Sequence, residues 1–175
     1  SSYYIVMEYY DGLTIEELLR AQPRLPIDVA LSIVLNVCSG LAPAHAESLV
    51  HRDIKPANII FTRQGSIKVA DFGLAKAIDK LTLVTNQGKV LGTPAYMSPE
   101  QTRGEVVGIQ SDIFSLGVVA YELLAGRRPF DGASYSEVVD RIQSQAPPAV
   151  SSFSPIVESP FEQIVGRMLC KRTEE

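Results

Sequence analysis

The pattern of apolar and polar positions begins with a strand and a helix. Residues 3–9 form an apolar, aromatic run, which predicts a buried strand. The dipeptide at 11–12, Asp-Gly, predicts a turn. Thr14 and Glu17 then have the spacing of a capping box, so we expect a helix to begin there.

A long apolar segment follows. Residues 27–47 predict a helix with Pro26 near its first turn, and Pro43 predicts a kink or an early end. The uncharged part of this segment, 29–44, is short for a membrane span and contains Asn, Ser and Pro. We therefore interpret it as a core helix and expect no membrane contact.

Two short apolar runs in the middle of the chain predict a hairpin. They are the strands at 58–62 and 66–70, joined by the turn "RQGS". Residues 74–110 show no sustained period. Residues 111–126 are apolar on nearly every side and predict a buried helix that Gly126 ends.

Two further helices fit 134–143 and 160–169. The pattern as a whole predicts an α+β fold that is mainly helical, with its few strands near the polar stretch at 51–58.

Composition excludes some classes of protein. The 175 residues carry a net charge of −4, which gives no support for a nucleic-acid partner. Cys38 and Cys170 are far apart, so we expect two buried free thiols in a reducing compartment rather than a disulfide or a zinc site.

The polar stretch at 51–58, "HRDIKPAN", carries the candidate chemistry. Asp53 could accept a proton from an attacking hydroxyl, Lys55 could neutralise charge on a transferred group, and Asn58 could offer an oxygen to a hard cation. The predicted hairpin brings Asp71 beside Asn58. Mg²⁺ takes one or two carboxylates plus substrate phosphates, so this set suits phosphoryl transfer.

Four motifs in order resemble those of the protein kinase superfamily: "HRDIKPAN", "DFG", "GTPAYMSPE" and "SDIFSLG". The chain resembles the large lobe of a serine/threonine kinase, and "YMSPEQ" is most similar to bacterial kinases of the eukaryotic type. The resemblance implies one partial kinase domain over 1–175, with the N-terminal lobe largely absent. Its parts would be the hinge strand 3–10, the catalytic loop 51–58, the activation segment 71–100 and a helical lobe to residue 175.

The resemblance also implies roles for individual residues. Asp53 resembles the catalytic base, and Lys55 the lysine that contacts the transferred phosphate. Asn58 and Asp71 resemble the ligands of Mg²⁺ or Mn²⁺, and Thr93 the threonine that binds the catalytic loop.

The family's nucleotide site implies roles for the first segment. Met7 would guard the back of the adenine pocket, Glu8 and Tyr10 would meet the adenine edge through their backbones, and Asp11 would reach the ribose of ATP.

Other residues have structural interpretations. We expect His51 to be packed and hydrogen-bonded, His45 to be an ordinary helix residue, and Asp112 and Glu100 to be structural acids of the large lobe. Glu100 is expected to be buried without the arginine that partners it in the family.

Arg52 is either a solvated charge or a partner for a phosphorylated loop. In the second case Thr85 is the first candidate for phosphorylation and Thr82 the second; the alternative is that both are solvent-facing loop threonines.

The sequence departs from the family pattern at both ends. It contains no GxGxxG, and its first lysine is Lys55, so the phosphate-covering loop and the ATP-contacting lysine are expected upstream of Ser1. Near the C-terminus, Arg172 and Thr173 stand in place of Asp and Pro. We therefore expect a fragment that is inactive or nearly so by itself.

The leading hypothesis is an ATP-dependent enzyme that phosphorylates Ser and Thr of protein substrates. The resemblance implies a cytoplasmic location, either free or as the cytoplasmic domain of a membrane-anchored kinase, and a possible kinase dimer for autophosphorylation. One alternative is a pseudokinase scaffold, which is disfavoured because the chain retains Asp53, Lys55, Asn58 and Asp71. The other is a small-molecule phosphotransferase, which is disfavoured by the protein-substrate segment "GTPAYMSPE".

Overall fold

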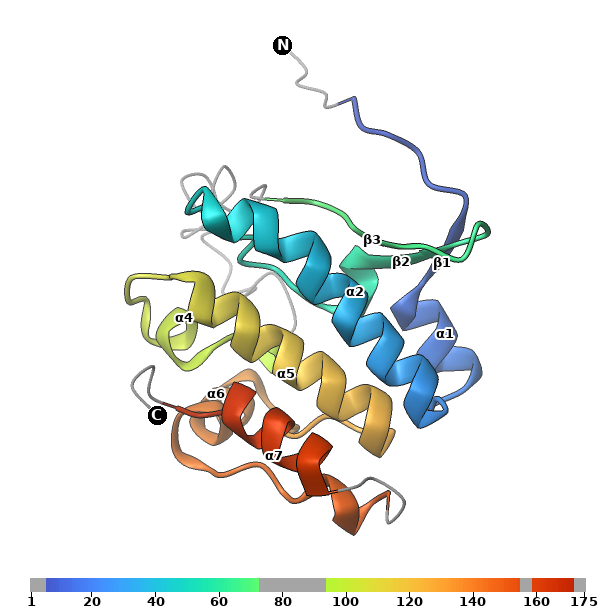
Figure 1. The fold of residues 1–175 in the computed structure, drawn as a ribbon. Coiled ribbons are helices and arrows are strands. Elements are labelled where there is room, and N and C mark those ends of the chain that lie inside the picture. Colours follow the sequence, from blue (N-terminus) through green and yellow to red (C-terminus); the bar gives the residue numbers. More distant parts are fainter. Residues whose placement is uncertain (1–5, 73–93, 155–158, 172–175) are drawn as a thin grey trace.

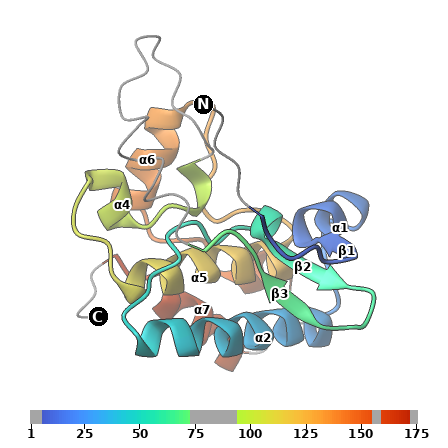
Figure 2. The ribbon, with the colours of Figure 1, turned by 90° about the horizontal axis from the view of Figure 1, so that it is seen from above.

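The fold combines a small sheet with a stack of helices (Figure 1). The computed structural model describes residues 6–72, 94–154 and 159–171. The strands lie beside one end of the helical layer, near α1 and α2 (Figure 2). The elements are β1 (Gly12–Thr14), α1 (Ile15–Ala21), α2 (Ile27–Ala46), η1 (Pro56–Asn58), β2 (Ile59–Thr62), β3 (Ile67–Val69), η2 (Pro94–Tyr96), α4 (Pro99–Arg103), α5 (Ile109–Ala125), α6 (Tyr135–Ser144), η3 (Val150–Ser152) and α7 (Ser159–Met168). This arrangement confirms the predicted mainly helical α+β class.

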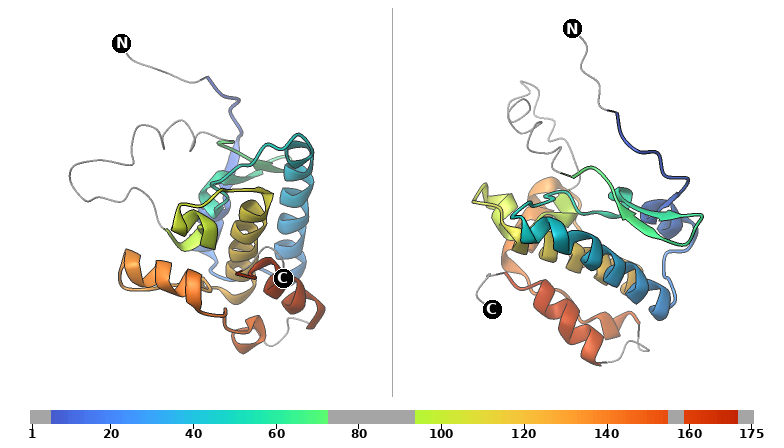
Figure 3. Two further views of the ribbon diagram at one scale, coloured as in Figure 1. Left: turned by 90° about the vertical axis from the view of Figure 1, so that its left-hand side faces the viewer. Right: turned by 45° about the horizontal axis from the view of Figure 1, so that its top comes forward.

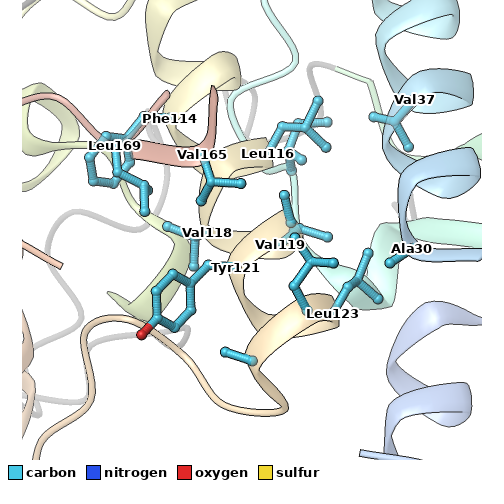
Figure 4. Close-up of a cluster of buried hydrophobic side chains, with 14 of the residues drawn as sticks. Ala30, Val37, Phe114, Leu116, Val118, Val119, Tyr121, Leu123, Val165 and Leu169 are labelled. Atoms are coloured by element: carbon cyan, nitrogen blue, oxygen red, sulfur yellow. The ribbon is translucent and has the colours of Figure 1, made fainter. Parts of the chain in front are cut away.

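Helix α5 is the central element of the core. It packs against α2 on one side and α7 on the other (Figure 4). As predicted, it is buried around most of its circumference and ends at Gly126, whose φ of 71° closes the helix in a left-handed cap. Gly117 allows α7 to approach, because a Cβ there would lie 2.8 Å from the Cβ of Met168. Each fully buried apolar side chain contributes about 1.5–3 kcal/mol, so α5 anchors the elements around it.

Helix α2 buries one face on this core, and its buried residues are Ala30, Ile33, Val37 and Leu41. Pro43 was expected to kink or end the helix early. An early end is wrong, since α2 continues to Ala46; Pro43 lies in the last turn, where little helix remains for its missing N–H to disrupt.

By length and composition α2 is the one described helix that could cross a membrane. The same test is passed by core helices of soluble proteins, and α2 buries Ala30, Ile33, Val37 and Leu41, although only 22% of the tested window is buried.

The predicted hairpin is confirmed. Strands β2 and β3 pair antiparallel with Ile59 opposite Val69, and Gly65 has a φ of 81° in the turn. The predicted capping box is also present at the start of α1, where Glu17 N–H donates to Thr14 Oγ1 and Thr14 N–H donates to Glu17 Oε2. The two predicted helices near the C-terminus correspond to α6 and α7.

Helix α4 was not predicted, because residues 74–110 show no sustained period. It has only five residues, Pro99–Arg103, too few to display helical periodicity. Ser98 and Gln101 form a capping box at its start, and Gly104 ends it with a φ of 69°. Cap residues rather than an apolar stripe therefore define this helix.

The strand predicted at 3–9 is wrong for its described part. Residues 6–11 have no regular structure and lead away from the body of the molecule (Figure 3). Val6 and Tyr9 are 86% and 85% exposed. Sheet pairing on this side of β2 begins only at Gly12, opposite Thr62, so the apolar run has no strand beside it in the described chain. An apolar run predicts a strand only where a partner strand is present.

The cysteine prediction needs a partial correction. Both thiols are free, as expected, but Cys38 is exposed and Cys170 is half-buried. Cys38 is not among the buried residues of α2, which are Ala30, Ile33, Val37 and Leu41.

Candidate active site

The loop at 51–58 is attached to the start of α5 through Asp112. This carboxylate is fully buried and accepts hydrogen bonds from the backbone N–H groups of His51 and Arg52, both at 2.8 Å. The imidazole of His45 lies 2.8 Å from the same carboxylate. A buried carboxylate with several donors forms a strong, charge-assisted network, so the loop is held rigidly on the central helix.

Asp112 is therefore structural, as predicted, whereas His45 is more than an ordinary helix residue. Its position in the last turn of α2, opposite the first turn of α5, brings it to Asp112. Sequence spacing alone does not show which helix ends meet.

His51 joins the loop to the end of the hairpin. Its ring is buried, and Nε2 lies 2.8 Å from the carbonyl oxygen of Ala70. Its Nδ1 accepts from the N–H of Asp53 at 3.3 Å, so the ring proton belongs on Nε2, which donates to Ala70. The ring also lies against Phe72, with centroids 4.5 Å apart. His51 thus has the packed, hydrogen-bonded environment expected of it.

Asp53, Lys55 and Asn58 form one hydrogen-bonded cluster. Lys55 Nζ donates to Asp53 Oδ2 at 2.7 Å. Asn58 Nδ2 donates to the same oxygen at 2.9 Å and to the carbonyl of Asp53 at 2.8 Å. The side chain of Asp53 is still 43% exposed, so an incoming hydroxyl group can reach it.

Asp71 follows the second strand of the hairpin, which is joined to Asn58 through Ala70. Ala70 N–H donates to the carbonyl of Asn58 at 2.8 Å, which places Asp71 one residue beyond the rung that contains Asn58. Asp71 has a φ of 65°, a left-handed conformation that is uncommon outside glycine. This strained geometry is typical of residues at functional sites.

The donor set suits a hard divalent cation that also binds phosphate. The amide nitrogen of Asn58 is committed to Asp53, so the amide oxygen is the atom that a cation would take. The described residues contain no group of three His, Cys, Asp or Glu side chains that could hold a metal by themselves. Mg²⁺ does not need one, because it usually takes one or two carboxylates and completes its shell with water and phosphate oxygens.

The other predicted site residues are not joined to this cluster. Among the described residues, no hydrogen bond or ion pair links 6–11 to the catalytic loop: Tyr10 donates to Glu8 at 2.7 Å, and Asp11 pairs with Arg63 at 3.1 Å. Met7 is 62% exposed. Thr82, Thr85 and Thr93 lie outside the described residues.

Glu100 differs from its prediction. It is half-buried rather than buried, and its carboxylate accepts a hydrogen bond from the hydroxyl of Ser111. Ser111 precedes Asp112 in the first turn of α5, so α4 and the catalytic loop are attached to the same turn.

Arg52 has a left-handed backbone, with φ 71°. Its side chain is half-buried.

The fold and this cluster agree with the family to which the chain belongs. The family described as protein kinase domain matches residues 1–175, so the chain is a member of the protein kinase family. Members of this family in general use ATP with a divalent metal and act on protein substrates.

The similar curated proteins are bacterial serine/threonine kinases, as the resemblance implied. The chain is 42% identical over 169 residues to serine/threonine-protein kinase PrkC of Bacillus subtilis, covering 97% of this chain and 26% of PrkC. It is 48% identical over 145 residues to PknA of Corynebacterium glutamicum, covering 83% of this chain and 31% of PknA. It is 39% identical over 171 residues to PknB of Mycobacterium leprae, covering 98% of this chain and 28% of PknB. The chain thus spans about a quarter to a third of these relatives' length.

Proposed function

We propose that the protein containing this chain is a serine/threonine protein kinase that transfers the γ-phosphoryl group of ATP to hydroxyl groups of protein substrates. The observation that carries the proposal is the hydrogen-bonded cluster of Asp53, Lys55 and Asn58 with Asp71 at the next rung of the hairpin. Positioning and charge neutralisation are the main requirements of phosphoryl transfer, and this cluster provides groups for both.

In the proposed reaction Asp53 orients the substrate hydroxyl and accepts its proton. The hydroxyl oxygen forms a bond to the γ-phosphorus as the bond from that phosphorus to the β,γ-bridging oxygen breaks, and ADP leaves. Lys55, 2.7 Å from Asp53, is placed to neutralise charge on the phosphoryl group in transit. Asn58 and Asp71 would hold Mg²⁺ or Mn²⁺, which supplies further charge neutralisation at the phosphates.

The remaining roles in the proposal come from the family resemblance. Met7, Glu8, Tyr10 and Asp11 belong to the adenine and ribose site, and Thr93 binds the catalytic loop. Thr85, then Thr82, are the candidates for phosphorylation, with Arg52 as their partner. The substrates are Ser- and Thr-containing proteins in the cytoplasm, and a second copy of the kinase would act in autophosphorylation.

The test is Asp53→Asn in the full-length protein. Asparagine keeps the size of the side chain but cannot accept the hydroxyl proton, so we expect phosphate transfer to fall by about a thousandfold or more. Radiolabel transfer from ATP to a generic protein substrate measures this, while nucleotide titration should show nearly unchanged ATP binding.

Asp140→Asn is the matched control, since Asp140 is an exposed aspartate on α6. Near-normal transfer by Asp53→Asn would overturn the assignment of the base. A wild-type protein that binds ATP without transferring phosphate would instead indicate a pseudokinase.

A further inference from the structure

The peptide group between Arg52 and Asp53 is held at both of its polar atoms. Its oxygen, the carbonyl of Arg52, accepts from Gln101 Nε2 at 2.7 Å. Its nitrogen, the N–H of Asp53, donates to His51 Nδ1 at 3.3 Å. Because a peptide group is planar, restraining both atoms restrains the plane from which the Asp53 side chain projects.

Gln101 comes from helix α4, far from the catalytic loop in sequence, and its side chain makes two different contacts. Its Oε1 accepts from the N–H of Ser98 at 2.9 Å, which is half of the capping box of α4. Its Nε2 donates to the Arg52 carbonyl. A backbone N–H needs an acceptor and a carbonyl needs a donor, so these two partners determine the orientation of the amide.

The left-handed conformation of Arg52 makes this contact more important. A non-glycine residue with a φ of 71° is strained, and such a conformation persists only where its surroundings hold it. Asp112 Oδ1 holds the N–H of Arg52 at 2.8 Å, and Gln101 holds its carbonyl. The two contacts come from different helices, α5 and α4.

We propose that Gln101 is a positioning residue for phosphoryl transfer, which orients Asp53 by holding the Arg52 carbonyl. This inference rests on the proposed kinase function. It assigns to Gln101 a role beyond capping, and it links α4, which follows the "GTPAYMS" segment, directly to the catalytic loop.

Two substitutions separate the roles of the Gln101 side chain. Gln101→Glu keeps an oxygen for the Ser98 N–H, as in an ordinary capping box, but presents an oxygen to the Arg52 carbonyl in place of a donor. Gln101→Lys does the reverse, because an ammonium group can donate to the carbonyl but cannot accept from Ser98.

We expect Gln101→Glu to lower kcat about tenfold in the full-length protein, with KM for ATP unchanged and little loss of thermal stability. Gln101→Lys should lose more thermal stability but keep kcat within about threefold of wild type. Amide hydrogen exchange at 51–58 should increase in Gln101→Glu only.

Glu17→Gln is the matched control, since it makes the reverse exchange in the capping box of α1, where Glu17 accepts from Thr14. It should leave kcat and loop exchange unchanged.

The inference is overturned if Gln101→Glu keeps wild-type kcat and exchange, or if kcat in both Gln101 variants simply follows their thermal stability. In those outcomes the wild type is still active, so the proposed function survives. An inactive wild type overturns the proposed function, and the positioning role with it.

Discussion

The catalytic loop at 51–58 and the N-terminal segment at 6–11 have opposite relations between composition and burial. The loop is polar, yet His51 is fully buried and Asn58 is only 6% exposed. The segment at 6–11 contains large apolar side chains, yet Met7 and Tyr9 are 62% and 85% exposed.

Partners explain this difference. In the loop, the buried polar groups have hydrogen-bond partners supplied by α5, α4 and the hairpin, so their burial costs little. The segment at 6–11 has apolar character without a neighbouring element to cover it.

The largest effect is expected at Asp71, one of the two residues proposed to hold the cation. Asp71→Ala should lower phosphate transfer in the full-length protein by about a thousandfold, because it removes the only carboxylate proposed to hold the cation beside Asn58. Transfer should be measured over a wide range of Mg²⁺ concentrations. Full rescue at high Mg²⁺ would reduce Asp71 to an accessory ligand.

The next effect concerns the support of the loop. Asp112→Ala leaves the buried N–H groups of His51 and Arg52 without an acceptor, and each such group costs about 1–3 kcal/mol. We expect a loss of about 3–4 kcal/mol in the free energy of unfolding, measured by urea denaturation.

Asp140→Ala, an exposed acid on α6, is the control and should change stability by less than about 0.5 kcal/mol. An equal loss in both variants would mean that the Asp112 network does not support the loop.

Lys171 is a smaller exception to the rule that buried polar groups have partners. Its Nζ is buried without a hydrogen-bond partner among the described residues and lies 3.6 Å from the ring centroid of Phe130. Burial lowers the pKa of Lys171 to about 8. The face of the Phe130 ring attracts the charged amine.

Between this pKa of about 8 and the ordinary value of 10.5, the unfolded chain binds more protons than the folded chain, so stability should rise with pH. Lys171→Met should therefore add about 1 kcal/mol at pH 7 and flatten that rise. Unfolding at pH 7 and pH 10 checks both expectations, with the exposed Lys68→Met as control. A destabilised Lys171→Met would show that the cation–ring contact outweighs burial.

The smallest effect is expected in the exposed segment. Tyr9→Ser should change the free energy of unfolding by less than about 0.5 kcal/mol, because the ring is 85% exposed. A loss above about 1 kcal/mol would show that Tyr9 packs against part of the protein in solution. The segment at 6–11 would then no longer differ from the loop at 51–58 in its burial.

Local signals in the sequence predicted much of this fold. The capping box of Thr14 and Glu17, the hairpin around Gly65 and the apolar helix ending at Gly126 depend on residues close in sequence, so their patterns are readable without a structure.

Tertiary contacts explain what was missed. His45 meets Asp112 because two helix ends come together, and Ser111 reaches Glu100 because α4 lies beside α5. Gln101 was visible only as part of "YMSPEQ", and no spacing rule connects it with Arg52. The prediction of a strand at 3–9 is wrong in its described part for the same reason, because a strand forms only where a second strand lies beside it to pair with.

The hairpin has a practical consequence for engineering. Asn58 precedes its first strand and Asp71 follows its second, whereas the turn at 63–66 lies at the opposite end of the ladder. A Cβ at Gly65 would meet nothing within 4 Å. A peptide tag or fluorescent reporter inserted between Gln64 and Gly65 should therefore leave the spacing of Asn58 and Asp71 unchanged, which makes this turn a natural point for length variation and for labelling.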